Sequence, residues 1–380
     1  MTNKKLSAVL VALLATASAL VPVGGAAQAA YRFSDFQGKP PVHVYKSAQS
    51  TPSGVTPAEI KKIYNLPATG GKGTIALIDA YDDANMESDL AAFDKQYNLP
   101  SCTTANGCFE KHKMATSTAS NSGWAMETSL DVEWAHAIAP TAKILLVEAK
   151  TPSGANLLSA IDYATARNDV VAVSMSWGGA EFSDELSYDT HFVGKTSSSI
   201  VFFASSGDDG AGASWPASSP NVIGVGGTSL QLASSGTLIA ETAWSGSGGG
   251  VSAYEKEPAY QTAYKISKAN GMRAIPDVSY DADPASGYPI YITTGTGTKK
   301  KGAWDTVGGT SAGAPQWAAI QALGDSVALA KFYTDKASTG TLKYFRDITS
   351  GSNGTCQYYC DARKRYDYVT GLGSPQTTKF

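Results

Sequence analysis

Charged residues are scarce in this chain of 380 residues, where they make up 17% of the sequence. The 30 Lys and Arg do not outnumber the 33 Asp and Glu, so there is no basic excess to attract nucleic acid or another polyanion. After an apolar stretch from Leu6 to about Val23, no second long hydrophobic run remains to span a membrane. We therefore expect a globular protein that binds neither nucleic acid nor membranes.

The N-terminus has the pattern of a secretory signal. Lys4 and Lys5 precede the apolar stretch, and Ala27-Gln28-Ala29 forms a small-residue cleavage site. We predict that residues 1–29 are a signal peptide and that the mature protein is secreted and extracellular. Loss of the two lysines leaves 28 basic against 33 acidic side chains and changes the formal net charge from −3 to −5.

Cysteine is also scarce, with four residues in the whole chain. They form two close pairs, Cys102 with Cys108 and Cys356 with Cys360. In an oxidising compartment the simplest expectation is one disulfide within each pair. The alternative is a zinc site, but these spacings, with no histidine nearby, are poor for zinc.

Apolar runs alternate with helical patterns along most of the chain. Residues 30–54 are expected to be an extended leader, and Thr56-Pro57-Ala58-Glu59 has the N-cap, first-turn proline and capping-box glutamate that begin a helix. Strands are predicted at 74–78, 143–147, 170–176, 200–204 and 222–225, and helices at 86–96, 127–138 and 156–167. The pattern predicts an α/β fold over residues 55–380, with a mostly parallel central sheet flanked by helices on both faces.

The run Val307–Pro315 places Ser311 in a glycine-rich turn at the start of an apolar helical pattern. Such a turn exposes the hydroxyl, and the helix N-terminus favours developing negative charge, so Ser311 is a candidate nucleophile. The Gly-Thr-Ser-Ala order is similar to that of subtilisin-like peptidases. The alternative is an ordinary turn with an N-cap serine.

Histidine, the usual proton acceptor for such a serine, occurs at only four positions: 43, 112, 136 and 191. None stands in the His-Gly-Thr-His setting that subtilisins use. Because triads are defined by geometry and not by order in the sequence, His136 keeps a serine–histidine–aspartate triad as an alternative.

Two carboxylates offer a different base. Glu127 and Asp131 are four residues apart, so on a helix they share one face, beside an apolar side that includes Leu130 and Trp134. Two like carboxylates beside a nucleophile can share a proton. The alternative is a solvated acidic face, and Glu133 is interpreted as an ordinary surface acid.

The loop Ser205–Gly210, which contains Asp208, directly follows the apolar run 200–204. Ligands bind at the carboxyl ends of parallel strands, so this aspartate is a candidate site residue. It has three possible roles: it holds the turn, it binds calcium, or it stays protonated and donates a hydrogen bond to an oxyanion.

These three segments, in the order Glu/Asp helix, Gly-Asp loop and Gly-Thr-Ser-Ala turn, resemble the sedolisin (kumamolisin-like) family of serine-carboxyl peptidases. The similarity extends from Thr56 to the end of the chain. Further matching stretches are residues 174–179, 215–220, 226–229, 248–252 and 276–279.

The resemblance implies a subtilisin-like fold and a secreted, acid-active serine endopeptidase that cleaves proteins and peptides. It assigns the nucleophile to Ser311, the general base to Glu127, the carboxyl that shares a proton with this base to Asp131, and the oxyanion-hole donor to Asp208. It also implies that the substrate is lined by Ser176, Trp177 and Gly178, although an aromatic residue beside two glycines equally suits a buried turn.

The resemblance further implies one structural calcium ion near the C-terminus, within about residues 345–375. The carboxylates of Asp347 and Asp367 would bind the ion, together with backbone carbonyls of Ile348, Arg363 and Arg365. The sequence departs from the family here, because positions 363 and 365 are usually glycines.

Sedolisins usually carry a long N-terminal prodomain. This sequence departs from the family a second time, because it has only residues 30–54 in that place. Folding and restraint of activity are therefore expected to proceed without that domain, in a protein that we expect to be a monomer. Two other functions stay open: a neutral, histidine-dependent subtilisin-type peptidase, and a non-catalytic descendant that binds peptides.

Overall fold

The computed structural model describes residues 31–116, 119–195, 199–295, 300–324, 328–334 and 343–378. The predicted signal peptide, residues 1–29, lies outside the described residues.

The central sheet has eight strands in the order β10-β9-β7-β5-β2-β4-β3, and β13 pairs with β9. Neighbouring strands are parallel except for β9 and β10. The strands are β2 Thr74–Ala80, β3 Phe109–Lys113, β4 Lys143–Ala149, β5 Val170–Met175, β7 Val201–Ser205, β9 Val222–Leu232, β10 Leu238–Ala243 and β13 Val278–Asp281. All five predicted strands occur, and the mostly parallel α/β fold is confirmed.

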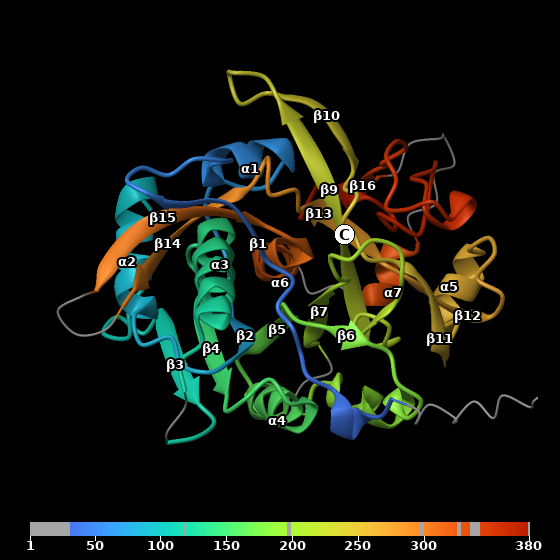
Figure 1. Ribbon diagram of the computed structural model, residues 1–380, viewed down its shortest axis with the longest axis horizontal. Coiled ribbons are helices and arrows are strands. Elements are labelled where there is room, and N and C mark those ends of the chain that lie inside the picture. Colours follow the sequence, from blue (N-terminus) through green and yellow to red (C-terminus); the bar gives the residue numbers. More distant parts are fainter. Residues whose placement is uncertain are drawn as a thin grey trace, which may run out of the picture. The chain divides into compact units, whose positions relative to one another are not determined.

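Helices cover both faces of this sheet (Figure 1). The helices are α1 Pro57–Ile63, α2 Met86–Tyr97, α3 Ser122–Ile138, α4 Gly154–Thr165, α5 Ala259–Tyr264, α6 Gly313–Leu323 and α7 Leu329–Phe332. The predicted start of α1 is confirmed, because the Thr56 side chain accepts from Glu59 N and the Glu59 carboxylate accepts from Thr56 N.

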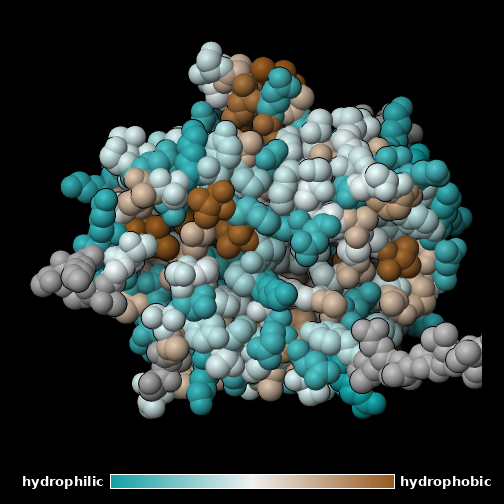
Figure 2. Space-filling model, viewed as in Figure 1, coloured by the Kyte–Doolittle hydropathy of each residue, from teal (hydrophilic) through white to brown (hydrophobic). Residues whose placement is uncertain are grey.

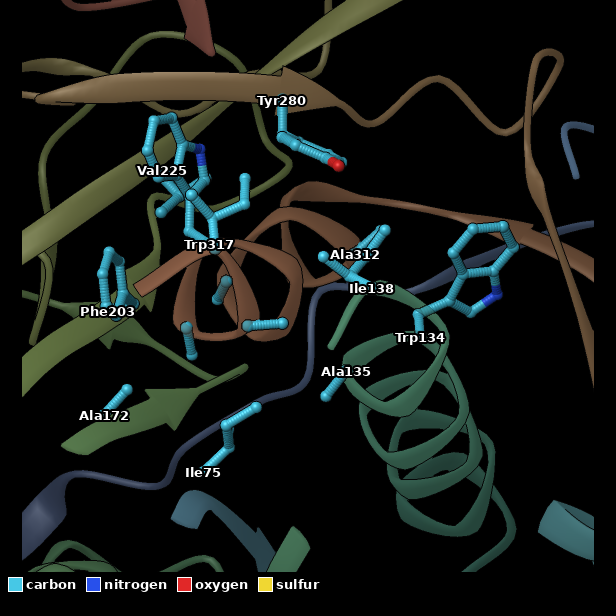
Figure 3. Packing of buried hydrophobic residues seen from close by; sticks show 14 of the residues in the cluster. Ile75, Trp134, Ala135, Ile138, Ala172, Phe203, Val225, Tyr280, Ala312 and Trp317 are labelled. Carbon is cyan, nitrogen blue, oxygen red and sulfur yellow. The ribbon is translucent and has the colours of Figure 1, made fainter. Parts of the chain in front are cut away.

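Strand β2 shows why the predicted strands are apolar throughout. Ile75 and Leu77 face one core, which is shared with α3 and α6, and Ala76 and Ile78 face a second core, shared with α4. Both sides of the strand are buried, so the alternation of apolar and polar residues disappears. Figure 3 shows the first core, where Ile138 of α3 lies near Ala312 at the start of α6, and Trp317 lies on the opposite side of α6, beside Phe203.

Smaller sheets complete the chain. β1 His43–Gln49, which lies in the predicted leader, pairs with β15 Lys301–Gly308, and β15 pairs with β14 Tyr288–Thr294. The two-stranded pairs are β6 Gly179–Ala180 with β8 Ser214–Trp215, β11 Gly250–Lys256 with β12 Met272–Ile275, and β16 Phe345–Arg346 with β17 Ser374–Pro375. Short 3-10 helices are η1 Phe33–Asp35, η2 Glu185–His191, η4 Thr310–Ala312 and η5 Gln357–Tyr359.

Both predicted disulfides are confirmed, Cys102–Cys108 and Cys356–Cys360. His136 lies close to the sulfur atoms of the first pair. Those sulfurs are bonded to each other, so they are not the thiolates that a zinc site requires.

The face drawn in Figure 1 is largely hydrophilic, and apolar residues gather at the tip of the β9–β10 hairpin (Figure 2). Ile239 in this hairpin has 61% of its surface exposed. Among the described residues, none of the helices combines the length and the hydrophobicity needed to span a membrane.

Candidate active site

Helix α3 carries the two predicted carboxylates. Asn121 caps the helix by accepting hydrogen bonds from Gly123 N and Trp124 N. Glu127 and Asp131 have no exposed surface, so the alternative of a solvated acidic face is wrong. The surface interpretation of Glu133 is also wrong, because this side chain is buried and accepts hydrogen bonds from the backbone N–H of Tyr291 in β14.

A third buried carboxyl, that of Asp79, belongs to the same cluster. It stands near the carboxyl end of β2 and has no exposed surface. It lies close enough to Asp131 and Glu127 for these groups to interact electrostatically. The sequence analysis missed Asp79, although its position directly after the apolar run 74–78 is the signal that singled out the Asp208 loop.

Ser311 lies in η4, immediately before the N-terminus of α6. Gly309 precedes this turn with φ +134°, a conformation that favours glycine. The Ser311 hydroxyl donates a hydrogen bond of 2.8 Å to the carbonyl oxygen of Pro41, in the predicted leader. The helix N-terminus behind Ser311 favours negative charge at this point.

Ser176 connects the carboxyl cluster to the serine turn. Its hydroxyl lies 2.7 Å from Asp131 Oδ1, to which it donates, and 3.2 Å from the backbone oxygen of Ser311. Ser176 directly follows β5. Its contacts with Asp131 and with the backbone of Ser311 therefore fix the positions of these two residues relative to the central sheet.

Asp208 lies in the loop after β7 and approaches the serine turn from the other side. Its Oδ1 accepts hydrogen bonds from the backbone N–H and the hydroxyl of Thr310, at 2.8 and 2.7 Å. Its Oδ2 lies 3.1 Å from Nε2 of His43. These hydrogen bonds hold Asp208 next to the residue that precedes Ser311.

Burial dominates the electrostatics of this cluster. It raises the pKa of Glu127 well above its ordinary value, the Asp131 and Asp79 carboxyls raise it further, and the Ser311 hydroxyl opposes the shift. Burial likewise raises the pKa values of Asp131 and Asp79. Since three close carboxyls repel one another when ionised, they share protons and do not all carry charge together.

All four histidines lie in the described residues, and none of them hydrogen-bonds to Ser311. The hydroxyl of Ser311 hydrogen-bonds to the Pro41 carbonyl. The Nε2 atom of His136 hydrogen-bonds to the Pro100 carbonyl and lies 3.4 Å from Asp94 Oδ1. His191 pairs with Asp162, and His112 stacks on Tyr163.

The predicted substrate-lining segment is partly buried. The side chain of Trp177 has no exposed surface, and its indole N–H donates to the Ile78 carbonyl. Ser176 is also buried, whereas Gly178 lines a cavity of about 710 Å³. Loop residues 206–214 and leader residues 37–43, apart from Gly38, line the same cavity.

The predicted calcium region brings its two aspartates toward the same loop. Asp347 accepts hydrogen bonds from Arg365 N, and Asp367 accepts from Arg363 N. The Arg363 guanidinium turns to Asp361, at 3.0 Å. Two carboxylates and the Ile348 carbonyl suit calcium, because calcium takes oxygen ligands. An ion bound here would share the carboxylate oxygens with the hydrogen bonds from Arg363 N and Arg365 N.

Comparisons with known proteins give a consistent answer. The profile of the Subtilase family matches residues 107–343. Sedolisin from Pseudomonas sp. (strain 101) is 28% identical over 88% of this chain and 62% of its own length. Kumamolisin from Bacillus sp. (strain MN-32) is 30% identical over 87% of this chain and 63% of its own length. The chain thus spans less than two thirds of either relative.

Among solved structures, Pseudomonas sedolisin, described as a serine-carboxyl proteinase complexed with two molecules of pseudo-iodotyrostatin, superposes with a TM-score of 0.71. The match has 28% identity and covers 86% of this chain and 96% of that one. A lanthipeptide protease shares the fold, with a TM-score of 0.51 at 13% identity over 84% of this chain and 91% of that one.

Proposed function

Because the chain belongs to the subtilase family, in its sedolisin branch, we propose that it is a serine-carboxyl endopeptidase that hydrolyses proteins and peptides. One observation supports this proposal above all: Ser311 lies close to the buried carboxyls of α3 and to Asp208. We further propose that the protein is secreted and acts as a monomer.

In the proposed reaction, the Ser311 hydroxyl attacks the peptide carbonyl and Glu127 takes its proton. Asp131 shares a proton with Glu127 and is itself oriented by the Ser176 hydroxyl. Glu127 then gives the proton to the leaving nitrogen, and water hydrolyses the acyl-enzyme with Glu127 again as the base. Asp79 adds a further carboxyl over which the cluster distributes its charge.

Asp208 supports an acidic working range. It can donate to an oxyanion only when it is protonated, and its burial raises its pKa toward that state. Activity therefore requires a pH at which Asp208 carries a proton and the Glu127 cluster still carries one negative charge, because a cluster without charge supplies no base. Burial raises the pKa values of both groups, and that of Asp131 to about 8, so the sharing of protons among the three carboxyls must keep one charge in the cluster where Asp208 is protonated.

The first test is hydrolysis of an unfolded protein between about pH 3 and pH 9, beside the Ser311→Ala variant. We expect Ser311-dependent cleavage with an acid maximum. A neutral maximum would favour the histidine-dependent subtilisin-type reaction instead. A folded protein that cleaves nothing at any pH would favour the non-catalytic, peptide-binding alternative.

We also propose one structural calcium ion between Asp347 and Asp367. The ion would bind the two carboxylates and the carbonyls of Ile348, Arg363 and Arg365, joining the loop before β17 to the segment after β16. The role of the ion would be structural only, because the residues that would bind it do not belong to the cluster around Ser311.

Chelation is expected to lower the melting temperature, because a ligand that binds only the native state stabilises it by about 2.7 kcal/mol at 100 times its Kd. The measurement is a melting curve with and without a chelator, together with metal analysis. Asp347→Asn should abolish the chelator effect, whereas Asp361→Asn, in the same region, should keep it. An unchanged melting curve and no bound metal would contradict the proposal.

A further inference from the structure

The loop that carries Asp208, residues 206–212, has little rigidity of its own. Gly207, Gly210 and Gly212 all have positive φ, at +104°, +76° and +149°. Glycine loses more conformational freedom on folding than any other residue, so such a loop keeps one conformation only where other segments hold it. The position of Asp208 therefore depends on the contacts that this loop, the Asp208 loop, makes with distant parts of the chain.

A second glycine-rich segment, residues 246–249, lies along the Asp208 loop. Gly248 N donates to the Gly207 carbonyl at 2.7 Å, and Gly212 and Gly249 exchange backbone hydrogen bonds of 2.7 and 3.0 Å. Because this segment is as rich in glycine as the loop, the two segments need a further fixed point.

Asn353 supplies such a fixed point, because it bonds to both segments. Its backbone oxygen accepts from Ala211 N at 3.2 Å, and its side-chain Nδ2 donates to the Ser247 carbonyl at 2.7 Å. The residue is buried, and its backbone oxygen lies so close to the loop that a Cβ on Gly210 would be 2.6 Å from it. Asn353 thus joins the C-terminal part of the chain to both segments around Asp208.

The Cys356–Cys360 disulfide holds Asn353 from the other side. Asn353 N donates to the Cys360 carbonyl at 3.0 Å, and the chain pairs antiparallel between Ser352 and Asp361. The disulfide closes the segment between these partners, and Cys360 is buried. A covalent link of this kind restricts the conformations open to the segment, so Cys360 stays opposite Asn353.

We propose that Asn353 is a positioning residue for Asp208 and that the Cys356–Cys360 disulfide keeps Asn353 in place. This inference rests on the proposed function, in which Asp208 donates a hydrogen bond to the oxyanion. Neither Asn353 nor the disulfide takes part in a bond-making step. Both act through the Asp208 loop, because an oxyanion donor stabilises the transition state only at hydrogen-bond distance from the developing charge.

The side-chain contact is tested with Asn353→Ala, which removes the donation to Ser247. Asn221→Ala is the matched control. Its Nδ2 also donates to a backbone oxygen, that of Asp189, but Asn221 precedes β9 at the amino end of the parallel strands, whereas the Asp208 loop follows the carboxyl end of β7.

We expect kcat per folded protein to fall roughly 10- to 100-fold in Asn353→Ala, because a misplacement of about 1 Å by a distant mutation can cost about 10²-fold. KM should change little, since the variant leaves the substrate contacts in place. The control Asn221→Ala should keep the kcat of the wild type. The measurement is steady-state hydrolysis of a peptide, with the folded fraction measured by circular dichroism.

Hydrogen exchange tests the same contact without relying on activity. The backbone amides of residues 206–212 should exchange faster in Asn353→Ala than in the wild type, because their fixed point is weakened. Their exchange should be unchanged in Asn221→Ala. Mass spectrometry of peptides that cover the Asp208 loop measures the difference.

The surroundings of Asp208 give a further readout in the pH profile. Burial raises the pKa of Asp208, and its contacts with His43 and Thr310 oppose the rise. Glu127 also lies within electrostatic range of Asp208, and Asp209 acts on His43. A loosened loop admits water, so the burial that raises the pKa of Asp208 is reduced.

Asp208 then keeps its proton only to a lower pH than in the wild type. The upper pH limit of activity should therefore move to lower pH in Asn353→Ala. A variant that merely contains less folded protein would keep the shape of the wild-type profile, so this measurement separates positioning from a general loss of stability.

The disulfide is tested with the double variant Cys356→Ser/Cys360→Ser, and Cys102→Ser/Cys108→Ser is its control. Both variants remove one short covalent loop, with sequence separations of 4 and 6. The first should show the lowered kcat, the shifted pH limit and the faster loop exchange of Asn353→Ala. The second should show none of the three.

Each other result has a definite meaning. An active wild type whose kcat, pH profile and loop exchange survive Asn353→Ala would overturn this inference and leave the proposed function standing. Equal effects in both cysteine variants, or loss of folding in Cys356→Ser/Cys360→Ser, would show that the disulfide is only structural and remove it from the proposal. A folded wild type without peptidase activity would overturn the proposed function, and this inference with it.

Discussion

Replacing Glu127 by Gln is expected to lower kcat/KM by roughly 10⁴-fold or more, nearly as much as Ser311→Ala, because members of one catalytic unit fail together. Glutamine has the same shape but accepts no proton from the serine. The side chain is fully buried, so water cannot easily replace it as the base. The measurement is steady-state hydrolysis of a peptide at the pH optimum of the wild type.

Glu133→Gln is a matched control on the same helix. Glu133 is equally buried, but it accepts its hydrogen bonds from Tyr291 N and belongs to no contact with Ser311. An amide oxygen can accept the same bonds, so this variant should stay active. Turnover by Glu127→Gln within a few-fold of the wild type would contradict the assignment of the base.

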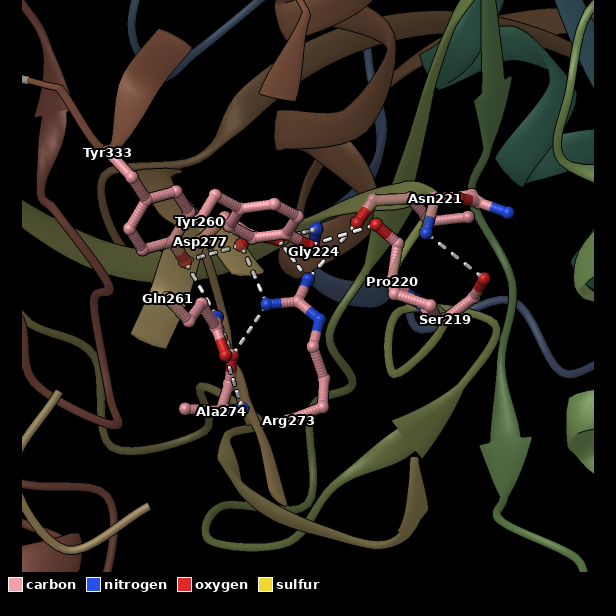
Figure 4. A network of polar contacts seen from close by, with 11 residues as sticks. Ser219, Pro220, Asn221, Gly224, Tyr260, Gln261, Arg273, Ala274, Asp277 and Tyr333 are labelled. Carbon is pink, nitrogen blue, oxygen red and sulfur yellow. Dashed lines mark hydrogen bonds and ion pairs between the residues drawn. The ribbon is translucent and has the colours of Figure 1, made fainter. Parts of the chain in front are cut away.

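Replacing Asp277 by Ala is expected to lower the free energy of unfolding by about 3–5 kcal/mol, because it leaves Arg273 as a buried, unpaired charge. The two side chains form a fully buried ion pair, with N–O distances of 2.6 and 2.8 Å. Gly224 N and the Tyr333 hydroxyl also donate to the Asp277 carboxylate (Figure 4).

This network joins the start of β9 to the β12–β13 connection and to α7, so its loss should affect the stability of the whole core. Urea unfolding measures the change. The double variant Arg273→Met/Asp277→Ala should be less destabilised than Asp277→Ala, because no unpaired charge remains in it. Equal stability of Asp277→Ala and the wild type would show that the pair contributes little.

The burial of this ion pair could not be predicted from the sequence. Arg273 and Asp277 are four residues apart, a spacing that on a helix would suggest a surface pair. In the structure Arg273 lies in β12 and Asp277 lies in the short connection from β12 to β13, and neither side chain has exposed surface. Tyr260 of α5 covers the Arg273 guanidinium, and Tyr333, directly after α7, donates to Asp277. These contacts come from distant segments, so no local pattern predicts the burial of the pair.

Glu133 was misjudged for the same reason. Its neighbours on α3 predict the helix, but its burial depends on β14, which lies far away in the sequence and donates Tyr291 N to the carboxylate. Asp79 was missed because no spacing motif links it to Glu127. These carboxyls meet only because the carboxyl end of β2 lies against the middle of α3 in the fold.

The sequence by itself determined the alternating strands and helices, both disulfides and the family, because apolar periodicity, close cysteine spacing and short motifs are local signals. Only the tertiary structure decided which carboxyls share one buried cluster, that Asp208 faces His43, and that the leader passes over Ser311. Those facts depend on contacts between segments far apart in the chain, and burial and pKa values arise from such contacts.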